Sequence, residues 1–521
     1  HTWQTWHQGG FYTERAVPDT YHEANGIDAS NPGCLIMAPA VTSIATGGAS
    51  QVSDLFVEAG ELFALAGRYC YHVRSDDTVD TITGTGSTGR DFGAGAVATK
   101  AKDFNALTYI GFSSATNIFS FDGTTWPQAT DAVRAQYWAR GYSTAWQLWR
   151  SYSTNTLAAV TAGSDPLTLA NWGSAYTVGD NSSPTTALCE ADDQVYVAKT
   201  DGLYGFDRTF VARQLLGDTA AMLHSSNGLN AIYSGGALYY PTVMGLLAYS
   251  RDGTSLLSVH PGANTGYRGT IRGLITAQQR VGAWHYATIY NGTDSWLLKG
   301  RYPTPGESLP DGWVGPMIWH ILTKLTAVQC DCFVVKGDVS PPRLYFGHGV
   351  NVAYITLPKS GNILAEADAG TLKFATTGSI WFTPDDWGAP GANKALVGLE
   401  IENEGLSSST NVAAYVSLDG GSYQSIGTAT AAGRASLLIP DIPLANRLQY
   451  RYDFTNNDST TTPRLKTITG RAAIKYVLRD LVRTTVICMD NVQRLDRTWD
   501  NSHKGESLLT HLKDRQSENS F

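Results

Sequence analysis

Short apolar runs separated by turn residues repeat along most of this chain. The clearest example is Gln194–Arg208, in which two runs of valine, leucine and tyrosine flank Asp201-Gly202. An Asp-Gly pair between two such runs is a strong signal for a tight β-hairpin. The stretch therefore predicts two adjacent strands, central or outer, of a small antiparallel sheet.

The same pair of strands recurs seven times. The second strand of each pair, here called the marker strand, is expected at Arg68–Arg74, Asn117–Trp126, Leu157–Trp172, Gly202–Asp207, Gly245–Gly253, Asp294–Tyr302 and Val350–Pro358. A shorter strand precedes each marker, at Leu62–Ala66, Ala106–Gly111, Gln147–Ser151, Gln194–Ala198, Ala237–Pro241, Ala283–Tyr290 and Arg343–Gly347. Successive markers are spaced by roughly the 40–50 residues of one four-stranded propeller blade. We therefore predict a divergent β-propeller over 41–358 with seven blades, and six or eight blades remain alternatives.

The rhythm changes after the last marker, and 359–475 is predicted to be a β-sandwich. Strands recur there at spacings of roughly 15 residues, bounded by turn residues, as in sandwich modules. The expected strands are Lys373–Phe382, Lys394–Glu402, Asn411–Leu418, Ala435–Ile439, Leu448–Phe454 and Leu465–Tyr476. The fold class is therefore all-β, a propeller followed by a sandwich.

The two ends of the chain lack this pattern. Residues 1–40 are rich in His, Trp, Tyr and Pro without clean periodicity. They predict an extended arm that lies either on the chain's own body or on a neighbouring subunit. Residues 476–521 predict a strand at Tyr476–Met489 and then a short amphipathic helix around Ser507–Leu512. A helix this short needs a partner surface to persist, so this end is predicted to be an assembly tail.

Composition narrows the function classes. The 521 residues are 42% hydrophobic and only 16% charged, which indicates a packed globular chain. The net charge is −8 and no basic stripe occurs, so no nucleic-acid partner is expected. There is no apolar run of about 18 residues, so no membrane span is expected either. Six cysteines are too few for a disulfide framework and fit synthesis in a reducing cytoplasm.

No motif in the sequence identifies a catalytic, cofactor or metal site. The carboxylate pairs Asp192-Asp193 and Asp385-Asp386 lie beside turn residues and are predicted to be solvated turn residues. Cys330 and Cys332 have no second Cys or His pair at metal-site spacing. They are expected to be buried on one face of a strand. Ser120–Trp126 is similar to the Asp-box of sialidase-like propellers, which is a structural staple of a turn.

Tryptophan supplies the only candidate contact residues. Trp138, Trp146 and Trp149 cluster within one predicted blade, and Trp381 and Trp387 lie in the predicted sandwich. Exposed aromatic rings can stack on sugars, although many such residues are core or interface anchors. These five residues are therefore candidates for contact with a glycan or a protein partner.

The whole-chain pattern resembles the tail-associated proteins of tailed bacteriophages. The resemblance rests on the divergent blades with phrases such as SDPLTLANW and GLLAYSRDG, on VSLDGGSYQSIG in the sandwich, and on the strand, charged turn and Leu-rich helix of Val482–Leu512. Minor tail, baseplate and fibre-like proteins of this kind combine a propeller with sandwich modules.

The resemblance implies a structural virion protein, in the tail rather than the head, made in the host cytoplasm. It implies a homo-oligomer that contacts other virion proteins through residues 1–40 and 476–521 and touches a host surface glycan. It carries over no catalytic residue and no cofactor, so no enzyme activity is expected. The alternatives are a propeller-type glycoside hydrolase and a lectin with a carbohydrate-binding sandwich.

Overall fold

The chain forms two compact units, residues 1–474 and 475–521. The computed structural model describes residues 2–10, 20–80, 82, 88–142, 145–191, 194–206, 211–216, 223–250, 256–261, 271, 273–305, 307, 316–359, 363–389, 391–437, 444–475, 492–493 and 499–500. In the small unit the described strands β39 (Val492–Gln493) and β40 (Trp499–Asp500) pair antiparallel. The strand predicted at Tyr476–Met489 and the helix predicted around Ser507–Leu512 lie outside the described residues.

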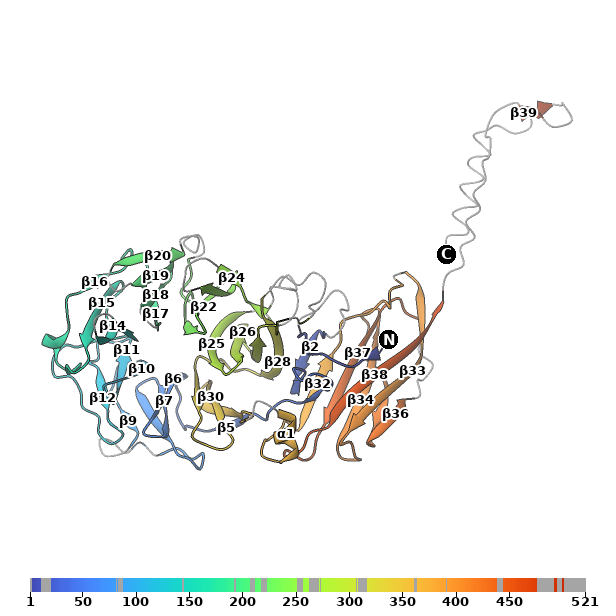
Figure 1. The fold of residues 1–521 in the computed structure, drawn as a ribbon, viewed down its shortest axis with the longest axis horizontal. Coiled ribbons are helices and arrows are strands. Elements are labelled where there is room, and N and C mark those ends of the chain that lie inside the picture. The colour runs from blue at the N-terminus through green and yellow to red at the C-terminus, as the bar shows by residue number, and fades with distance from the viewer. Residues whose placement is uncertain are drawn as a thin grey trace. The chain divides into compact units, whose positions relative to one another are not determined.

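The large unit contains a seven-bladed β-propeller (Figure 1). Within the described residues, seven antiparallel sheets of three or four strands follow one another along the chain. The first three blades are β6 (Val52–Glu58), β7 (Glu61–Ala66), β8 (Tyr69–Val73) and β9 (Arg90–Asp91); β10 (Ala98–Phe104), β11 (Leu107–Phe112) and β12 (Phe119–Phe121); and β13 (Tyr137–Tyr142), β14 (Trp146–Ser151), β15 (Thr156–Thr161) and β16 (Tyr176–Thr177), with a 3₁₀ turn at Leu169–Asn171.

The remaining blades continue the pattern. They are β17 (Thr185–Glu190), β18 (Val195–Lys199), β19 (Gly202–Phe206) and β20 (Ala212–Leu216); β21 (Ile232–Ser234), β22 (Ala237–Thr242), β23 (Gly245–Ser250) and β24 (Leu256–Ser258); β25 (Leu274–Val281), β26 (Trp284–Tyr290), β27 (Ser295–Arg301) and β28 (Ile318–Leu325); and β29 (Phe333–Lys336), β30 (Arg343–His348) and β31 (Asn351–Thr356) with β5 (Thr42–Ile44). All seven predicted marker strands are the third strands of blades, and the strands predicted before them are the second strands. The prediction of seven blades is confirmed.

Two observations establish that the ring is closed. The last blade takes its outer strand from the start of the chain, because β5 pairs with β31, Thr42 opposite Tyr354 and Ile44 opposite Val352. The first strands of successive blades also contact one another around a complete circle, from β6 through β10, β13, β17, β21, β25 and β29 back to β6. Closure of this kind removes most exposed sheet edges.

Apolar packing between neighbouring blades explains the sequence pattern. The central strands β18 and β19 are buried along their whole length because a blade in the ring is covered on both faces. Each pair of neighbouring blades shares an apolar cluster. Between the third and fourth blades, for example, Trp149 packs on Phe206 with ring centroids 5.3 Å apart. Burial of each such side chain stabilises the ring by roughly 1.5–3 kcal/mol.

The sandwich has two facing sheets, as predicted, but it is larger than the predicted segment. One sheet runs β1 (Thr2–Trp3), β38 (Arg464–Lys475), β33 (Asn393–Glu404) and β36 (Gly433–Leu437). The other runs β2 (Glu23–Asn25), β32 (Thr377–Trp381), β37 (Leu448–Thr455), β34 (Asn411–Leu418) and β35 (Gln424–Ala429). The sequence did not predict β35 or the short helix α1 (Ile363–Asp368) that precedes the sandwich.

The described part of residues 1–40 lies on the chain's own body. Its strands β1 and β2 complete the two sandwich sheets, pairing with β38 and β32. Strands β3 (Ile27–Asp28) and β4 (Ile36–Met37) form a small hairpin of their own. Trp6 and Tyr21 are fully buried in a cluster that also contains residues of the fifth and sixth blades and of the sandwich. The arm therefore joins the propeller and the sandwich around one shared core.

Candidate functional site

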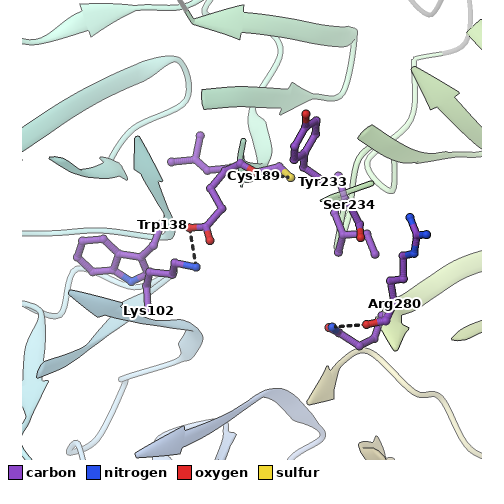
Figure 2. A pocket seen from close by; sticks show the side chains of 11 residues that line it. Lys102, Trp138, Cys189, Tyr233, Ser234 and Arg280 are labelled. Carbon is purple, nitrogen blue, oxygen red and sulfur yellow. Dashed lines mark hydrogen bonds and ion pairs between the residues drawn. The ribbon is translucent and has the colours of Figure 1, made fainter. Parts of the chain in front are cut away.

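One concave site among the described residues is a cavity lined by the first strands of the propeller blades (Figure 2). One part has a volume of about 320 Å³, and an adjoining part of about 250 Å³ shares Lys102, Trp138 and Gln279 with it. The lining comes from β10, β13, β17, β21 and β25, which lie in five consecutive blades. Because first strands form the inner circle of the ring, this cavity lies at the propeller axis.

Glu190 is the centre of an ion-pair network in this cavity. Lys102 Nζ lies 2.7 Å from its Oε2, and Arg140 Nη2 lies 3.0 Å from its Oε1. Arg140 also reaches Asp103, with Nη1 2.7 Å from Oδ2. Burial would raise the pKa of the Glu190 carboxyl, but Lys102 and Arg140 outweigh burial and the pKa is lowered. Glu190 is therefore held ionised, and its network links the second, third and fourth blades.

A second ion pair links the first two blades in the adjoining part. Lys100 Nζ lies 3.1 Å from Asp54 Oδ1, and the backbone N–H of Ala101 donates to Asp54 Oδ2 at 2.8 Å. Burial would lower the pKa of Lys100, but the Asp54 charge raises it. Nearby, burial raises the pKa of Asp331, which accepts a hydrogen bond from Gln329 at 2.8 Å. Asp331 is not among the side chains that line either part of the cavity.

Arg280 differs from Lys100 and Lys102, the lysines that line the cavity, in its bonding partners. Its Nε donates to the carbonyl of Gly282 at 3.2 Å, and no carboxylate of the described residues pairs with it. Figure 2 places Arg280 and Ser234 on the side opposite Lys102 and Trp138. The lining thus carries both signs of charge, hydroxyls and an amide, which suits a polar solute or water better than an apolar ligand.

The five candidate tryptophans are not gathered in one place. Trp138 lines the cavity but is only 5% exposed, and its ring packs near Tyr109 and Trp172. Trp149 is 3% exposed between the third and fourth blades. Trp146 is 51% exposed at the start of β14, with an edge contact to Tyr142 at 5.6 Å. Only Trp146 of these three offers an open ring to a partner.

The two sandwich tryptophans differ from each other. Trp387 packs partly buried against the shared core, close to Gly470 of β38. Trp381 is half-buried at the end of β32, where it lies opposite Glu23 of β2 and Arg451 of β37. Among the described residues it has no aromatic or hydrogen-bonding partner for its indole ring.

Two predicted turns are confirmed, but the prediction that Asp385 is solvated is wrong. Its side chain is only 6% exposed, and burial raises the pKa of its carboxyl. Asp122 accepts hydrogen bonds from the backbone of Thr124 and Thr125, which staples the Ser120–Trp126 turn. Asp385 and Asp386 cap the backbone of Trp387 and Gly388 in the same way, while Asp192-Asp193 lies outside the described residues.

Cys330 and Cys332 are buried as expected, but the prediction that they share a strand face is wrong. They precede β29 and pack into clusters on opposite sides of the last blade. Burial raises the pKa of both thiols. The five described cysteines are free, and the described residues contain no cluster of three or more metal-ligating side chains. Searching the same part of the chain for a helix with the length and hydropathy to cross a bilayer finds none.

No protein-family model matches the sequence, and no curated protein matches it. Among solved structures the chain is similar to the AfRom2 CNH domain, with 9% identity, a TM-score of 0.38, and coverage of 62% of this chain and all of that domain. It is also similar to Chaetomium thermophilum Raptor, with 10% identity, a TM-score of 0.39, and coverage of 60% of this chain but 28% of Raptor. Likenesses this low carry no inference about function.

Proposed function

We propose that this chain is a structural component of a bacteriophage virion, associated with the tail or baseplate, which mediates subunit assembly and contacts the host surface. The observation that carries the proposal is the shared core, in which the arm, two blades and the sandwich are packed together. Such packing makes a propeller and a sandwich one stiff body, as an assembly part requires. The resemblance of the sequence to tail-associated proteins supplies the biological setting.

The state of the cavity carboxylates also supports an assembly role. Glu190 and Asp54 are each bound by cations from neighbouring blades. A general acid at neutral pH would need a raised pKa, whereas that of Glu190 is lowered. These residues are therefore better suited to linking neighbouring blades than to acid catalysis.

Residues 475–521 suit the role of a tether. They form a compact unit of their own, so this unit can bind a neighbouring subunit while residues 1–474 keep their fold. The proposed partners are other virion proteins and further copies of this chain.

The test is particle composition. Mass spectrometry of tailed-phage particles purified from a host carrying the gene should detect the chain at a fixed number of copies per particle. Truncation after Ile474 should leave folded protein that no longer enters particles. Particles that are complete and infective without the chain would overturn the proposal.

A propeller-type glycoside hydrolase is the second candidate, favoured by one observation. Glu190 lines the cavity, and the backbone carbonyl of Asp331 accepts a hydrogen bond at 2.6 Å from Asn230, which lines the adjoining part. The pKa values of the two carboxyls shift in opposite directions, and such pairs can divide acid and base roles. Hydrolysis of oligosaccharides that is lost in both Glu190→Gln and Asp331→Asn would establish this reading in place of the first.

A further inference from the structure

The outer face of the five-stranded sandwich sheet carries one continuous row of large polar and aromatic side chains. The strand register places Tyr415 opposite Arg451, Arg451 opposite Trp381, and Trp381 opposite Glu23. The neighbouring residues Ile380, Tyr452 and Val416 are buried in the core, so alternation along each strand directs the row away from the core.

Arg451 contacts two tyrosine rings, that of Tyr415 in the row and that of Tyr423 beside it. Its guanidinium carbon lies 4.3 Å from the Tyr415 ring centroid and 4.9 Å from that of Tyr423. Asp453 on the same strand pairs with Arg451, with Oδ2 2.9 Å from Nη2. Cation–π contacts and an ion pair fix the rings at low entropic cost.

The polar side chains of the row are partly accessible. Arg451 and Asp453 are 25% and 31% exposed, so their exposed polar atoms can bond to a ligand, whereas Arg451 Nε and Asp453 Oδ1 are buried. Trp381 is half-buried, and its indole has no aromatic or hydrogen-bonding partner among the described residues, so the exposed part of the ring can stack on a sugar.

We propose that this face is a carbohydrate-binding platform for a neutral, hexose-based oligosaccharide. Trp381 and Tyr415 lie two strand spacings apart, about 9.5 Å, so one sugar chain laid across the strands contacts both rings. Apolar faces of the sugars stack on the rings, and their hydroxyls bond to Arg451 and Asp453. Asp453 pairs with Arg451 and offsets its charge, which disfavours an acidic sugar. The inference rests on the proposed host-surface contact and names its ligand class.

The test is calorimetric titration of the full chain with neutral gluco-, galacto- and manno-oligosaccharides of four to six units, and with sialylated and uronate oligosaccharides. We expect at least one neutral series to bind. Trp381→Ala should weaken binding about tenfold or more, and Asp453→Asn should weaken it less. Trp146→Ala removes an exposed tryptophan of the propeller and is the matched control, which should bind as the unaltered chain does.

Thermal unfolding of each variant separates lost binding from lost folding, and the conservative Asp453→Asn variant remains informative if Trp381→Ala does not fold. Binding of acidic sugars alone, no binding at all, or loss of binding only in Trp146→Ala would overturn the inference. A chain found in particles that binds no neutral sugar would refute the platform but not the virion role. A chain that binds sugar but is absent from particles would refute the virion role but not the platform.

Discussion

Two lysine–carboxylate ion pairs of the propeller differ in how deeply they are buried and in which parts of the chain they join. Lys299 of the sixth blade meets Asp28 of the arm with side chains only 8% and 0% exposed, whereas Lys102 and Glu190 in the cavity are 22% and 34% exposed. The buried pair joins the arm to the propeller, and the cavity pair joins blades that also share apolar clusters. We therefore expect removal of one partner to destabilise the chain more at the buried pair between arm and propeller than at the partly exposed pair in the cavity.

The physical reason is the cost of an uncompensated charge. Burial would raise the pKa of Asp28, but the Lys299 ammonium and the Ser30 hydrogen bonds outweigh it and lower the pKa. Removing one member of such a pair leaves the other charged in a low-dielectric site. In the cavity, solvent screens the charge that remains.

The largest effect is expected for Asp28→Asn. The variant leaves the Lys299 ammonium buried opposite a neutral amide, so the free energy of unfolding should fall by about 3–5 kcal/mol. Urea denaturation followed by fluorescence measures it. The double variant Asp28→Asn with Lys299→Met should recover most of the loss, and equal losses in both proteins would contradict the explanation.

The second largest effect is expected in the pH dependence of stability, through a histidine at the same contact between arm and propeller. His320 is fully buried beside Tyr21, their rings stacked with centroids 6.3 Å apart. Burial, with the Lys299 charge, lowers its pKa from 6.5 to about 3. Between these values the unfolded chain binds a proton that the folded chain does not, so stability is complete above pH 6.5 and falls as the pH decreases toward 3.

Replacing His320 with Phe should flatten this dependence by roughly 1.4 kcal/mol per pH unit between pH 4 and 6. Unfolding free energies measured across that range supply the slope. An unchanged slope in the variant would mean that His320 is protonated in the folded chain or is not buried.

The smallest effect is expected for Glu190→Gln in the cavity. Loss of the exposed pairs with Lys102 and Arg140 should cost about 0–1 kcal/mol, and 0.5 M salt should shrink the difference further. Denaturation at low and high salt measures both. A loss of unfolding free energy as large as that of Asp28→Asn would show that the cavity network stabilises the chain as much as the buried pair does. It would contradict the difference expected between the two sites.

The sequence predicts the second and third strands of every blade. Neighbouring blades cover both faces of these strands, so the strands are apolar along their whole length, and a turn joins each pair. The first strands were not recognised, because the inner circle tolerates side chains such as Lys102 and Glu190. The cavity residues escaped prediction for a related reason. Each blade contributes one or two of them, and nothing local distinguishes them from solvated strand residues.

The arm was foreseen as extended, but its pairing was not. Strands of two or three residues such as Glu23–Asn25 and Thr42–Ile44 carry too little periodicity to reveal a partner hundreds of positions away. The row Tyr415–Arg451–Trp381 is likewise visible only once the register is known. Of the candidate tryptophans, the sequence could not separate Trp146 and Trp381 from the buried Trp149, since burial depends on neighbouring blades.

The closure of the ring by β5 has a consequence for synthesis. Thr42–Ile44 leaves the ribosome long before its partner strand Asn351–Thr356, which emerges near the end of the propeller. At about 5–20 residues per second, the nascent chain carries an unmatched strand for some tens of seconds. Trp6 and Tyr21 stay unburied for longer, because the sandwich strands that share their core are synthesised after the propeller. We therefore expect the growing polypeptide to depend on chaperones until these strands are made.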